Sequence, residues 1–145
     1  MKKLLFLTAF FCFFTLSAGD AFACSCLRPS QQSLSQKVKK SYREAAAVFY
    51  GEVTEITQKP ENSYVTVKLK VEKSWKNQAG REVVIQTGRG GGGDCGYRFE
   101  IGNKYLVYAY RSESILETNI CLRTSASDAD SKYLDKIKKP KLFSK

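Results

Sequence analysis

Two cysteines separated by a single residue, Cys24 and Cys26, stand where a short apolar leader gives way to a polar chain, and only Cys95 and Cys121 follow. In an exported protein, four such cysteines predict two disulfides, whereas zinc held by four thiolates is the alternative that a reducing compartment would favour. The sequence alone leaves all three pairings open. We therefore expect a small exported domain whose modest core is supplemented by covalent bridges.

Residues 1–23 have the features of a secretory signal peptide. Two lysines precede an apolar run over residues 4–16, and small residues at positions 21 and 23 provide a cleavage site. The apolar run is too short for a comfortable membrane span. Cleavage after Ala23 would make Cys24 the first residue of a mature chain with one domain, residues 24–145.

The same cleavage region allows a second interpretation, in which Cys24 is acylated as in a bacterial lipoprotein. Lipoprotein signals resemble the pattern Leu-Ala-Gly-Cys, but here Ala21 replaces the usual leucine and Phe22 is bulky for its position. We favour export without a lipid, to a secreted or periplasmic location. The choice matters because acylation would consume the α-amino group of Cys24 and would anchor the protein to lipid.

Charge and composition exclude several classes of function. Removing Lys2, Lys3 and Asp20 from a chain of net charge +10 leaves +9. The chain has no histidine, which excludes catalytic triads and metal sites that need imidazole. The glycine-rich stretch at residues 88–93 lacks the Lys-Ser/Thr pair of a P-loop and the βαβ context of a dinucleotide site. We expect no enzyme activity, no cofactor and no metal of its own.

The middle of the chain has the alternation of β-strands. Apolar residues at positions 65, 67, 69 and 71 alternate with polar ones, which predicts one buried face and one solvated face. Gly51 inside the preceding strand indicates a bend or bulge, and Trp75 is expected to fill the core at a strand end. The predicted strands cover residues 48–56, 65–71, 83–87, 104–110 and 115–121, the last of them ending at Cys121.

Two helices are predicted from apolar residues spaced by four. The first begins after Ser33 or Ser35 and runs to about Ala47, and the second covers residues 128–139. Their expected core-facing residues are Leu34, Val38 and Tyr42 in the first helix, and Ala129, Tyr133 and Ile137 in the second. Five strands, an early helix and a C-terminal helix predict a mainly β fold, a small five-stranded OB-fold barrel with two disulfides.

Four sequence elements together resemble a known family: Cys24-Ser25-Cys26, Phe49-Tyr50-Gly51-Glu52-Val53, Asp94-Cys95-Gly96-Tyr97 and Cys121. They are similar to the N-terminal domain of the tissue inhibitors of metalloproteinases (TIMPs) and its bacterial relatives, over nearly the whole of residues 24–145. The resemblance implies an OB fold and the pairing Cys24–Cys95 with Cys26–Cys121. The vertebrate members have a third disulfide, for which no cysteines remain in residues 24–145 of this chain.

The resemblance also implies a mechanism and a set of site residues. In the family, the amine and carbonyl oxygen of the terminal cysteine bind the catalytic zinc of a target protease, so the metal belongs to the target. Carried over, Cys24 would chelate that zinc and Ser25 would enter the pocket beside it. The remaining contacts with the protease cleft would be made by Cys26, Leu27, Gly93, Asp94 and Cys95.

The expected partners are a zinc metalloprotease and, through the basic tail, an anionic envelope surface; no nucleic acid is expected, and we expect a monomer. The tail contributes Lys136, Lys138, Lys139, Lys141 and Lys145. The alternative functions are a non-catalytic OB-fold binding module for an anionic polymer, or an envelope lipoprotein that has lost inhibition.

Overall fold

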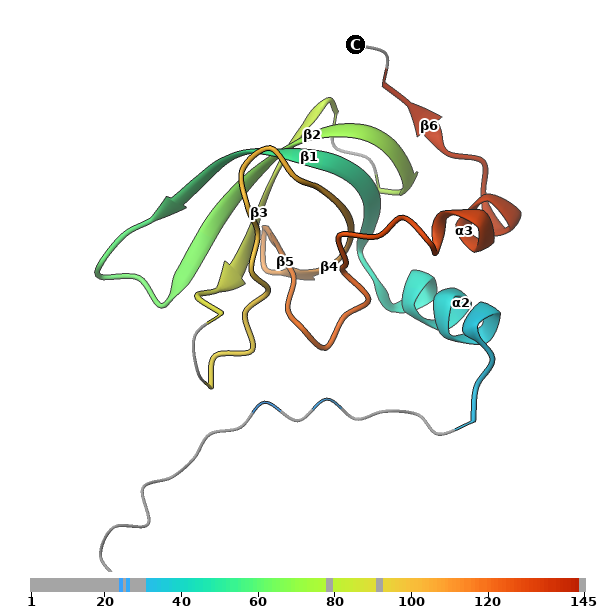
Figure 1. Cartoon of the computed structure of the whole chain (residues 1–145), viewed down its shortest axis with the longest axis horizontal. Coiled ribbons are helices and arrows are strands. Elements are labelled where there is room, and N and C mark those ends of the chain that lie inside the picture. Colours follow the sequence, from blue (N-terminus) through green and yellow to red (C-terminus); the bar gives the residue numbers. More distant parts are fainter. Residues whose placement is uncertain (1–23, 25, 27–30, 78–79, 91–92, 144–145) are drawn as a thin grey trace, which may run out of the picture.

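The structure is a computed structural model that describes residues 24, 26, 31–77, 80–90 and 93–143. It is mainly β, with a closed five-stranded barrel and two helices on one side of it (Figure 1). The elements are α2 (Leu34–Glu44), β1 (Ala47–Gln58), β2 (Tyr64–Lys76), β3 (Glu82–Gly88), β4 (Lys104–Ser112), β5 (Ile115–Glu117), α3 (Ser131–Ile137) and β6 (Lys141–Leu142).

Barrel closure follows from the strand order β1-β4-β5-β3-β2, because β1 also pairs with β2. The β3–β5 pairing is parallel, whereas the other barrel pairings are antiparallel. This arrangement confirms the predicted five-stranded OB-fold barrel. The short β6 adds to β2 outside the barrel.

The long strands β1 and β2 are bent (Figure 1), and their pairing is irregular. Their pairing shifts register at three places, one of them between Tyr50 and Gly51. A Cβ at position 51 would lie 2.6 Å from the backbone oxygen of Lys70, so only glycine allows the strands to approach this closely. The bulge predicted at Gly51 is therefore confirmed.

Two clusters of buried side chains stabilise the fold. The first fills the barrel and includes the four alternating residues of β2, which are Val65, Val67, Leu69 and Val71. The second lies between the barrel and the helices and contains Trp75, Tyr108 and Leu134. Because β4 separates the two clusters, all of its residues from 105 to 109 are buried. The predictions for β2, β4 and Trp75 are confirmed.

Helix α2 begins after Ser33, one of the two predicted capping residues, and the structure shows a capping box there. The Ser33 side chain accepts from the Gln36 backbone N–H, and the Gln36 side chain accepts from the Ser33 backbone N–H. The predicted end near Ala47 is wrong, because Ala45 is already extended and Ala46 donates to Ala109 on β4. Val38 is buried as expected.

Leu34 does not face the core, because 42% of its surface is exposed at the first turn of α2.

Helix α3 is shorter than predicted and presents a different face to the barrel. It spans seven residues, and its buried residue is Leu134 rather than the expected Ala129 or Ile137, which are exposed. Asp130 explains the shift, since its carboxylate is held by the Arg123 side chain at 2.7 Å. The helix starts only after this anchored residue.

In the described part of the chain, no helix has the length and apolar character needed to span a bilayer.

Candidate functional site at the Cys24–Cys95 bridge

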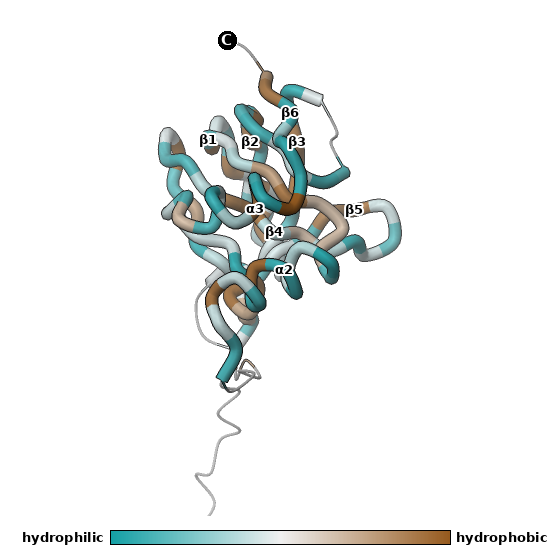
Figure 2. The backbone as a smooth tube through the Cα atoms, turned by 90° about the vertical axis from the view of Figure 1, so that its right-hand side faces the viewer, coloured by the Kyte–Doolittle hydropathy of each residue, from teal (hydrophilic) through white to brown (hydrophobic). Residues whose placement is uncertain are grey.

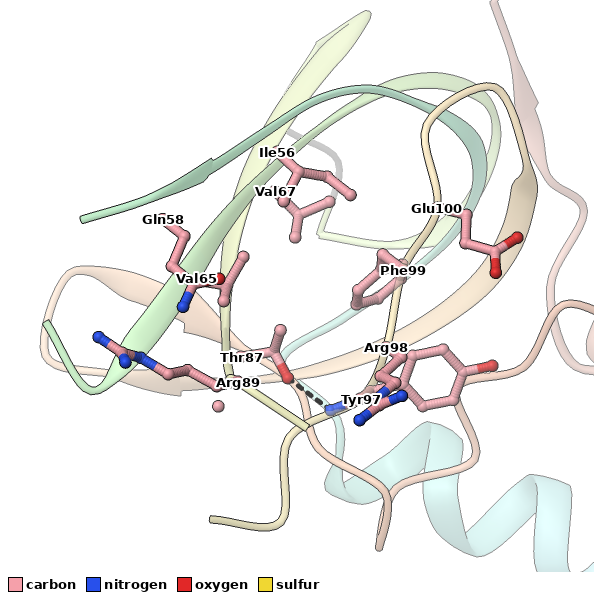
Figure 3. Close-up of a pocket in the computed structure, with 11 residues that line it drawn as sticks. Ile56, Gln58, Val65, Val67, Thr87, Arg89, Tyr97, Arg98, Phe99 and Glu100 are labelled. Atoms are coloured by element: carbon pink, nitrogen blue, oxygen red, sulfur yellow. Dashed lines mark hydrogen bonds between the residues drawn. The ribbon is translucent and has the colours of Figure 1, made fainter. Parts of the chain in front are cut away.

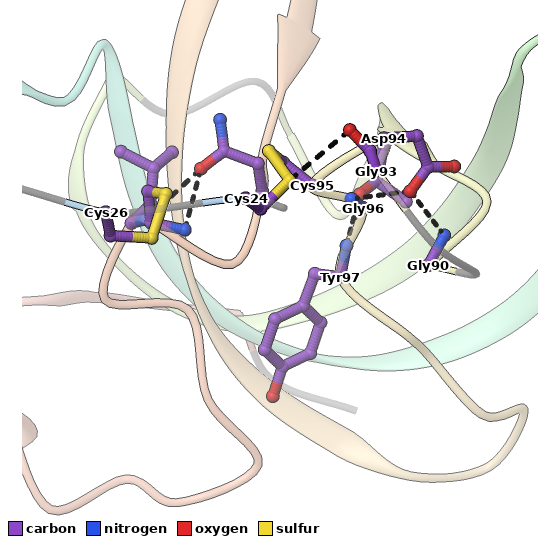
Figure 4. The surroundings of a disulfide bond; sticks show 12 residues. Cys24, Cys26, Gly90, Gly93, Asp94, Cys95, Gly96 and Tyr97 are labelled. Atoms are coloured by element: carbon purple, nitrogen blue, oxygen red, sulfur yellow. Dashed lines mark hydrogen bonds between the residues drawn. A yellow bond between two sulfur atoms is a disulfide. The ribbon is translucent and has the colours of Figure 1, made fainter. Parts of the chain in front are cut away.

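Two disulfides hold the first described residues against the barrel (Figure 4). Cys24 is bonded to Cys95 and Cys26 to Cys121, with Cα–Cα distances of 5.5 and 5.1 Å. This is the pairing that the family resemblance implied, and it is confirmed. Two disulfides are compatible with an extracellular or periplasmic location, where oxidising conditions preserve them.

The two bridges end on neighbouring parts of one hydrogen-bonded unit, which we call the bridge platform (residues 93–96 and 118–122). The backbone N–H of Ile120 donates to the carbonyl of Cys95 at 3.0 Å, which joins the β3–β4 loop to the segment after β5. The Thr118 N–H donates to Gln86 on β3 at 2.9 Å. The platform is therefore continuous with the barrel.

Cys121 was predicted to end the last strand, and that prediction is wrong. Strand β5 stops at Glu117, and the hydroxyl of the buried Thr118 then donates to the backbone of Tyr108 at 2.9 Å. Asn119 continues the turn, with its side-chain oxygen accepting from the Cys121 N–H at 2.9 Å. Cys121 consequently lies in a turn that the Asn119 side chain holds in place.

Asp94 folds the glycine-rich loop around its own carboxylate. Its Oδ1 accepts from the backbone N–H groups of Gly90 and Gly96, each at 3.1 Å. These hydrogen bonds favour the ionised carboxylate and lower the pKa of Asp94 below its ordinary value of 3.8, with the Gly96 bond as the largest cause. The glycine loop thus has a charged centre that fixes the approach to Cys95.

Close backbone packing gives Cys95 its direction. A Cβ at Gly96 would lie 2.1 Å from the carbonyl oxygen of Gly88, so the loop can cross β3 only with glycine at this position. Cys95 itself has φ of 53°, in the left-handed region that non-glycine residues rarely adopt. This conformation presents the Cys95 side chain to Cys24 (Figure 4).

The structure brings most of the predicted site residues together. Beyond the disulfide, Cys24 Sγ lies 3.4 Å from the carbonyl oxygen of Gly93; the bridged sulfur carries no proton, so this is a packing contact. Gly93 and Asp94 are exposed beside it, whereas Cys24, Cys26 and Cys95 are half-buried.

Ser25 and Leu27, the other two predicted contacts, lie outside the described residues.

Sequence reasoning missed the residues that build the platform. Besides Asn119 and Ile120, which belong to the platform, Thr87 supports the residue that follows platform residues 93–96, because its side-chain oxygen accepts from the Tyr97 N–H at 2.8 Å (Figure 3). The usable signal was Asn119, since asparagine favours turns in which its side chain hydrogen-bonds the backbone two residues on. Nothing comparable marks Ile120, which contributes only its backbone.

Apart from the disulfide region, a hollow of about 270 Å³ opens at the mouth of the barrel (Figure 3). Its lining includes the apolar residues Ile56, Val67 and Phe99. Two arginines flank it, and both hold neighbouring loops: Arg89 Nε donates to the Asn62 carbonyl at 3.0 Å, and Arg98 Nε to the Gly90 carbonyl at 2.8 Å. The hollow is thus apolar at its base, with its guanidinium groups engaged by backbone.

Among the described residues, no group of three or more histidine, cysteine, aspartate or glutamate side chains could hold a metal ion. Comparison of the chain with protein-family models and with curated protein sequences finds no match.

Proposed function

We propose that this protein is an exported inhibitor of zinc metalloproteases that acts through the backbone of Cys24. The observation that carries the proposal is the double attachment of Cys24 and Cys26 to a single platform. Two bridges on residues only two positions apart fix both Cys24 and Cys26 to the barrel. Two residues held in this way can present their backbone atoms to a partner in a fixed arrangement.

The proposed chemistry requires that residues 1–23 be removed as a signal peptide, so that Cys24 has a free α-amino group. An α-amine has an ordinary pKa of about 7.7–8.0, so a useful fraction is neutral and can donate to a metal at neutral pH. The amine nitrogen and carbonyl oxygen of one residue form a five-membered chelate ring with a metal. A catalytic zinc keeps one coordination position open for water, which this chelate would displace.

Preorganisation supports the same proposal. Ordering a flexible peptide at an interface reduces affinity, and fixing it beforehand removes much of that free-energy cost. The exposed Gly93 and Asp94 lie beside Cys24 and would contact the rim of the protease cleft. Ser25 would enter the pocket next to the zinc, and Cys26 and Leu27 would continue along the cleft.

The decisive experiment places one extra alanine before Cys24. The mature protein and the extended protein are purified with both disulfides intact, their N-termini are verified by intact mass, and each is titrated against a panel of soluble zinc proteases. We expect inhibition by the mature form to fall by orders of magnitude in the extended form, because the nitrogen becomes an amide. A matched control carries the extra alanine after Lys145 and should inhibit normally.

Equal inhibition by the extended and mature proteins would exclude chelation by the amine. No inhibition by either form would favour the alternative functions. Of these, an OB-fold binding module is favoured by the hollow at the barrel mouth, and an acylated lipoprotein would be revealed by a diacylglycerol mass on Cys24. The same mass measurement therefore separates the lipoprotein from the inhibitor.

A further inference from the structure

The positive charge of this protein is concentrated on α2, α3 and β6. Residues 34–44 and 131–142 contain nine lysines and arginines against two acidic residues. The basic residues are Lys37, Lys39, Lys40, Arg43, Lys132, Lys136, Lys138, Lys139 and Lys141. Figures 1 and 2 show that α2, α3 and β6 lie in a row along the same side of the barrel. We call this side the basic face.

The carboxylates on these elements leave most of this charge uncompensated. Glu44 pairs with Lys40 at 3.9 Å, and Asp135 accepts from the indole N–H of Trp75 at 2.8 Å. Just before α3, Asp130 pairs with Arg123, and Asp128 is exposed. The lysines of α3 and β6 are thus free of ion pairs among the described residues.

Exposed apolar and half-buried aromatic groups lie among these lysines. Leu34, Ile137 and Leu142 are exposed by 42, 37 and 66% of their surface. Three lysine–aromatic pairs occur on or beside the same elements, with the ammonium nitrogen 5.2–5.3 Å from the ring centroid: Lys76–Tyr42, Lys132–Tyr133 and Lys141–Phe143. Lysines interleaved with aromatic and aliphatic groups are typical of surfaces that rest at a membrane interface.

The basic face also has a shallow hollow where the end of β2 meets the segment after α3. It measures about 280 Å³, and four of its lining residues are lysines, namely Lys76, Lys138, Lys139 and Lys141. Lys76 is held by the carbonyls of Tyr42 and Arg43 at 2.8 and 2.9 Å. The other three lysines are exposed. Several ammonium groups around one hollow complement the negative charge of a phosphate headgroup.

From these observations we propose that the basic face is a docking surface for an anionic phospholipid bilayer. Lysines near such a surface each add to binding, and the exposed Ile137 and Leu142 would enter the boundary between headgroups and acyl chains. Those apolar side chains favour a bilayer over a soluble polyanion, which would gain little from them. Docking through this face is independent of the proposed inhibition and would hold the protein at a membrane surface.

The experiment measures binding of the disulfide-bonded chain, residues 24–145, to vesicles of phosphatidylcholine with and without phosphatidylglycerol. Sedimentation gives the bound fraction as a function of lipid and salt. Trp75 is the only tryptophan and is a buried residue bordering the lysine hollow, so energy transfer from it to a dansyl-labelled headgroup should be more efficient when this face meets the lipid than when the opposite side of the barrel does. Soluble dextran sulfate serves as the competing polyanion.

Two variants with the same change in net charge identify the face. The test variant carries Lys136→Gln, Lys138→Gln, Lys139→Gln and Lys141→Gln. The control variant carries Lys59→Gln, Lys70→Gln, Arg81→Gln and Arg111→Gln, all of which are exposed on or beside barrel strands. A third variant, Leu142→Gln, keeps every charge and tests insertion.

We expect binding that requires phosphatidylglycerol and weakens with salt, a loss of roughly tenfold or more in the test variant, and a change within about twofold in the control. The Leu142→Gln variant should bind several-fold more weakly. Equal losses in both charge variants, absence of transfer from Trp75, or preference for dextran sulfate over vesicles would each overturn the proposal. If the test variant fails to fold, Leu142→Gln and the Trp75 signal of the unmodified chain still decide it.

Discussion

The backbone N–H of Ile120 lies 3.0 Å from the carbonyl oxygen of Cys95 and donates to it, so the partners of both disulfides meet across one hydrogen bond. Cys95 provides the acceptor of this bond, and Cys121 directly follows Ile120, which provides the donor. The two bridges are consequently coupled through the platform as well as through Cys24 and Cys26. Disturbing either loop should affect both.

The first prediction concerns the second bridge. Cys26→Ser with Cys121→Ser opens a loop of 95 positions, which the chain-entropy estimate values at about 4–5 kcal/mol. Removing Cys24–Cys95 as well should lower the free energy of unfolding by less than twice that amount, because the loops overlap. Urea denaturation of the single-bridge and no-bridge variants measures this. Strictly additive losses would contradict the expected effect of the overlapping loops.

The second prediction tests the close crossing of the glycine loop over β3. Gly96→Ala should lower the free energy of unfolding by more than about 3 kcal/mol, because its Cβ would overlap the Gly88 carbonyl. Gly102→Ala is the matched control. Gly102 has φ of 82° but no atom within 4 Å of the added Cβ, so backbone strain of about 1–2 kcal/mol is all that is expected. Thermal or urea denaturation measures both losses in free energy of unfolding, and equal losses in the two variants would contradict the close crossing at Gly96.

The third prediction concerns pH and Asp94. Its pKa is lower in the folded protein than its ordinary value of 3.8, so the ionised carboxylate stabilises the loop above that pH. The contribution should be lost as pH falls below 3.8 and through the folded pKa. Amide hydrogen exchange at Gly90 and Gly96 should accelerate in that window, relative to Val67 in the barrel. In Asp94→Asn, exchange at both glycines should no longer depend on pH in this way; persistence of the dependence would exclude Asp94 as its cause.

The fourth prediction distinguishes the buried face of α3 from its exposed face. Leu134 is fully buried against Trp75 and its neighbours, so Leu134→Ala should cost about 2–5 kcal/mol through lost contacts and a cavity. Ile137→Ala, at an exposed position three residues later, should change the free energy of unfolding by roughly 0.5 kcal/mol or less. Similar losses in the two variants, measured by urea denaturation, would contradict the packing of α3.

The barrel was predictable because its strongest signal is local. Alternation along β2 determines which face of the strand is buried, and the glycine at position 51 determines where the sheet bends. Both signals can be recognised in the sequence of one strand without knowing its partner strands. The platform was less predictable, because it depends on a contact between the backbones of Ile120 and Cys95, which any residue type could make. The spacing of Cys24 and Cys26 after the leader identified these two residues, whereas their pairing with Cys95 and Cys121 and the contacts expected of their neighbours were implied by the family resemblance.

The helices show the same division between local and distant causes. The start of α2 depends on Ser33 and Gln36, three positions apart, and Ser33 was one of the two residues predicted to cap this helix. The start of α3 depends on the grip of Arg123 on Asp130, which shifts the buried position to Leu134. A spacing of four fits several registers in so short a helix, so the tertiary contact decides among them.

The crossing pattern of the two bridges bears on how the protein matures. Cys24 and Cys26 are synthesised first, but their partners lie in loops that are set in place only when β3, β4 and β5 have assembled. An oxidant acting on each thiol as it emerges would join the first two cysteines to each other. The native disulfides therefore form only after the barrel has assembled, or a disulfide isomerase has to replace an earlier wrong bridge. A chain that carries both native disulfides is consequently one in which the barrel has assembled.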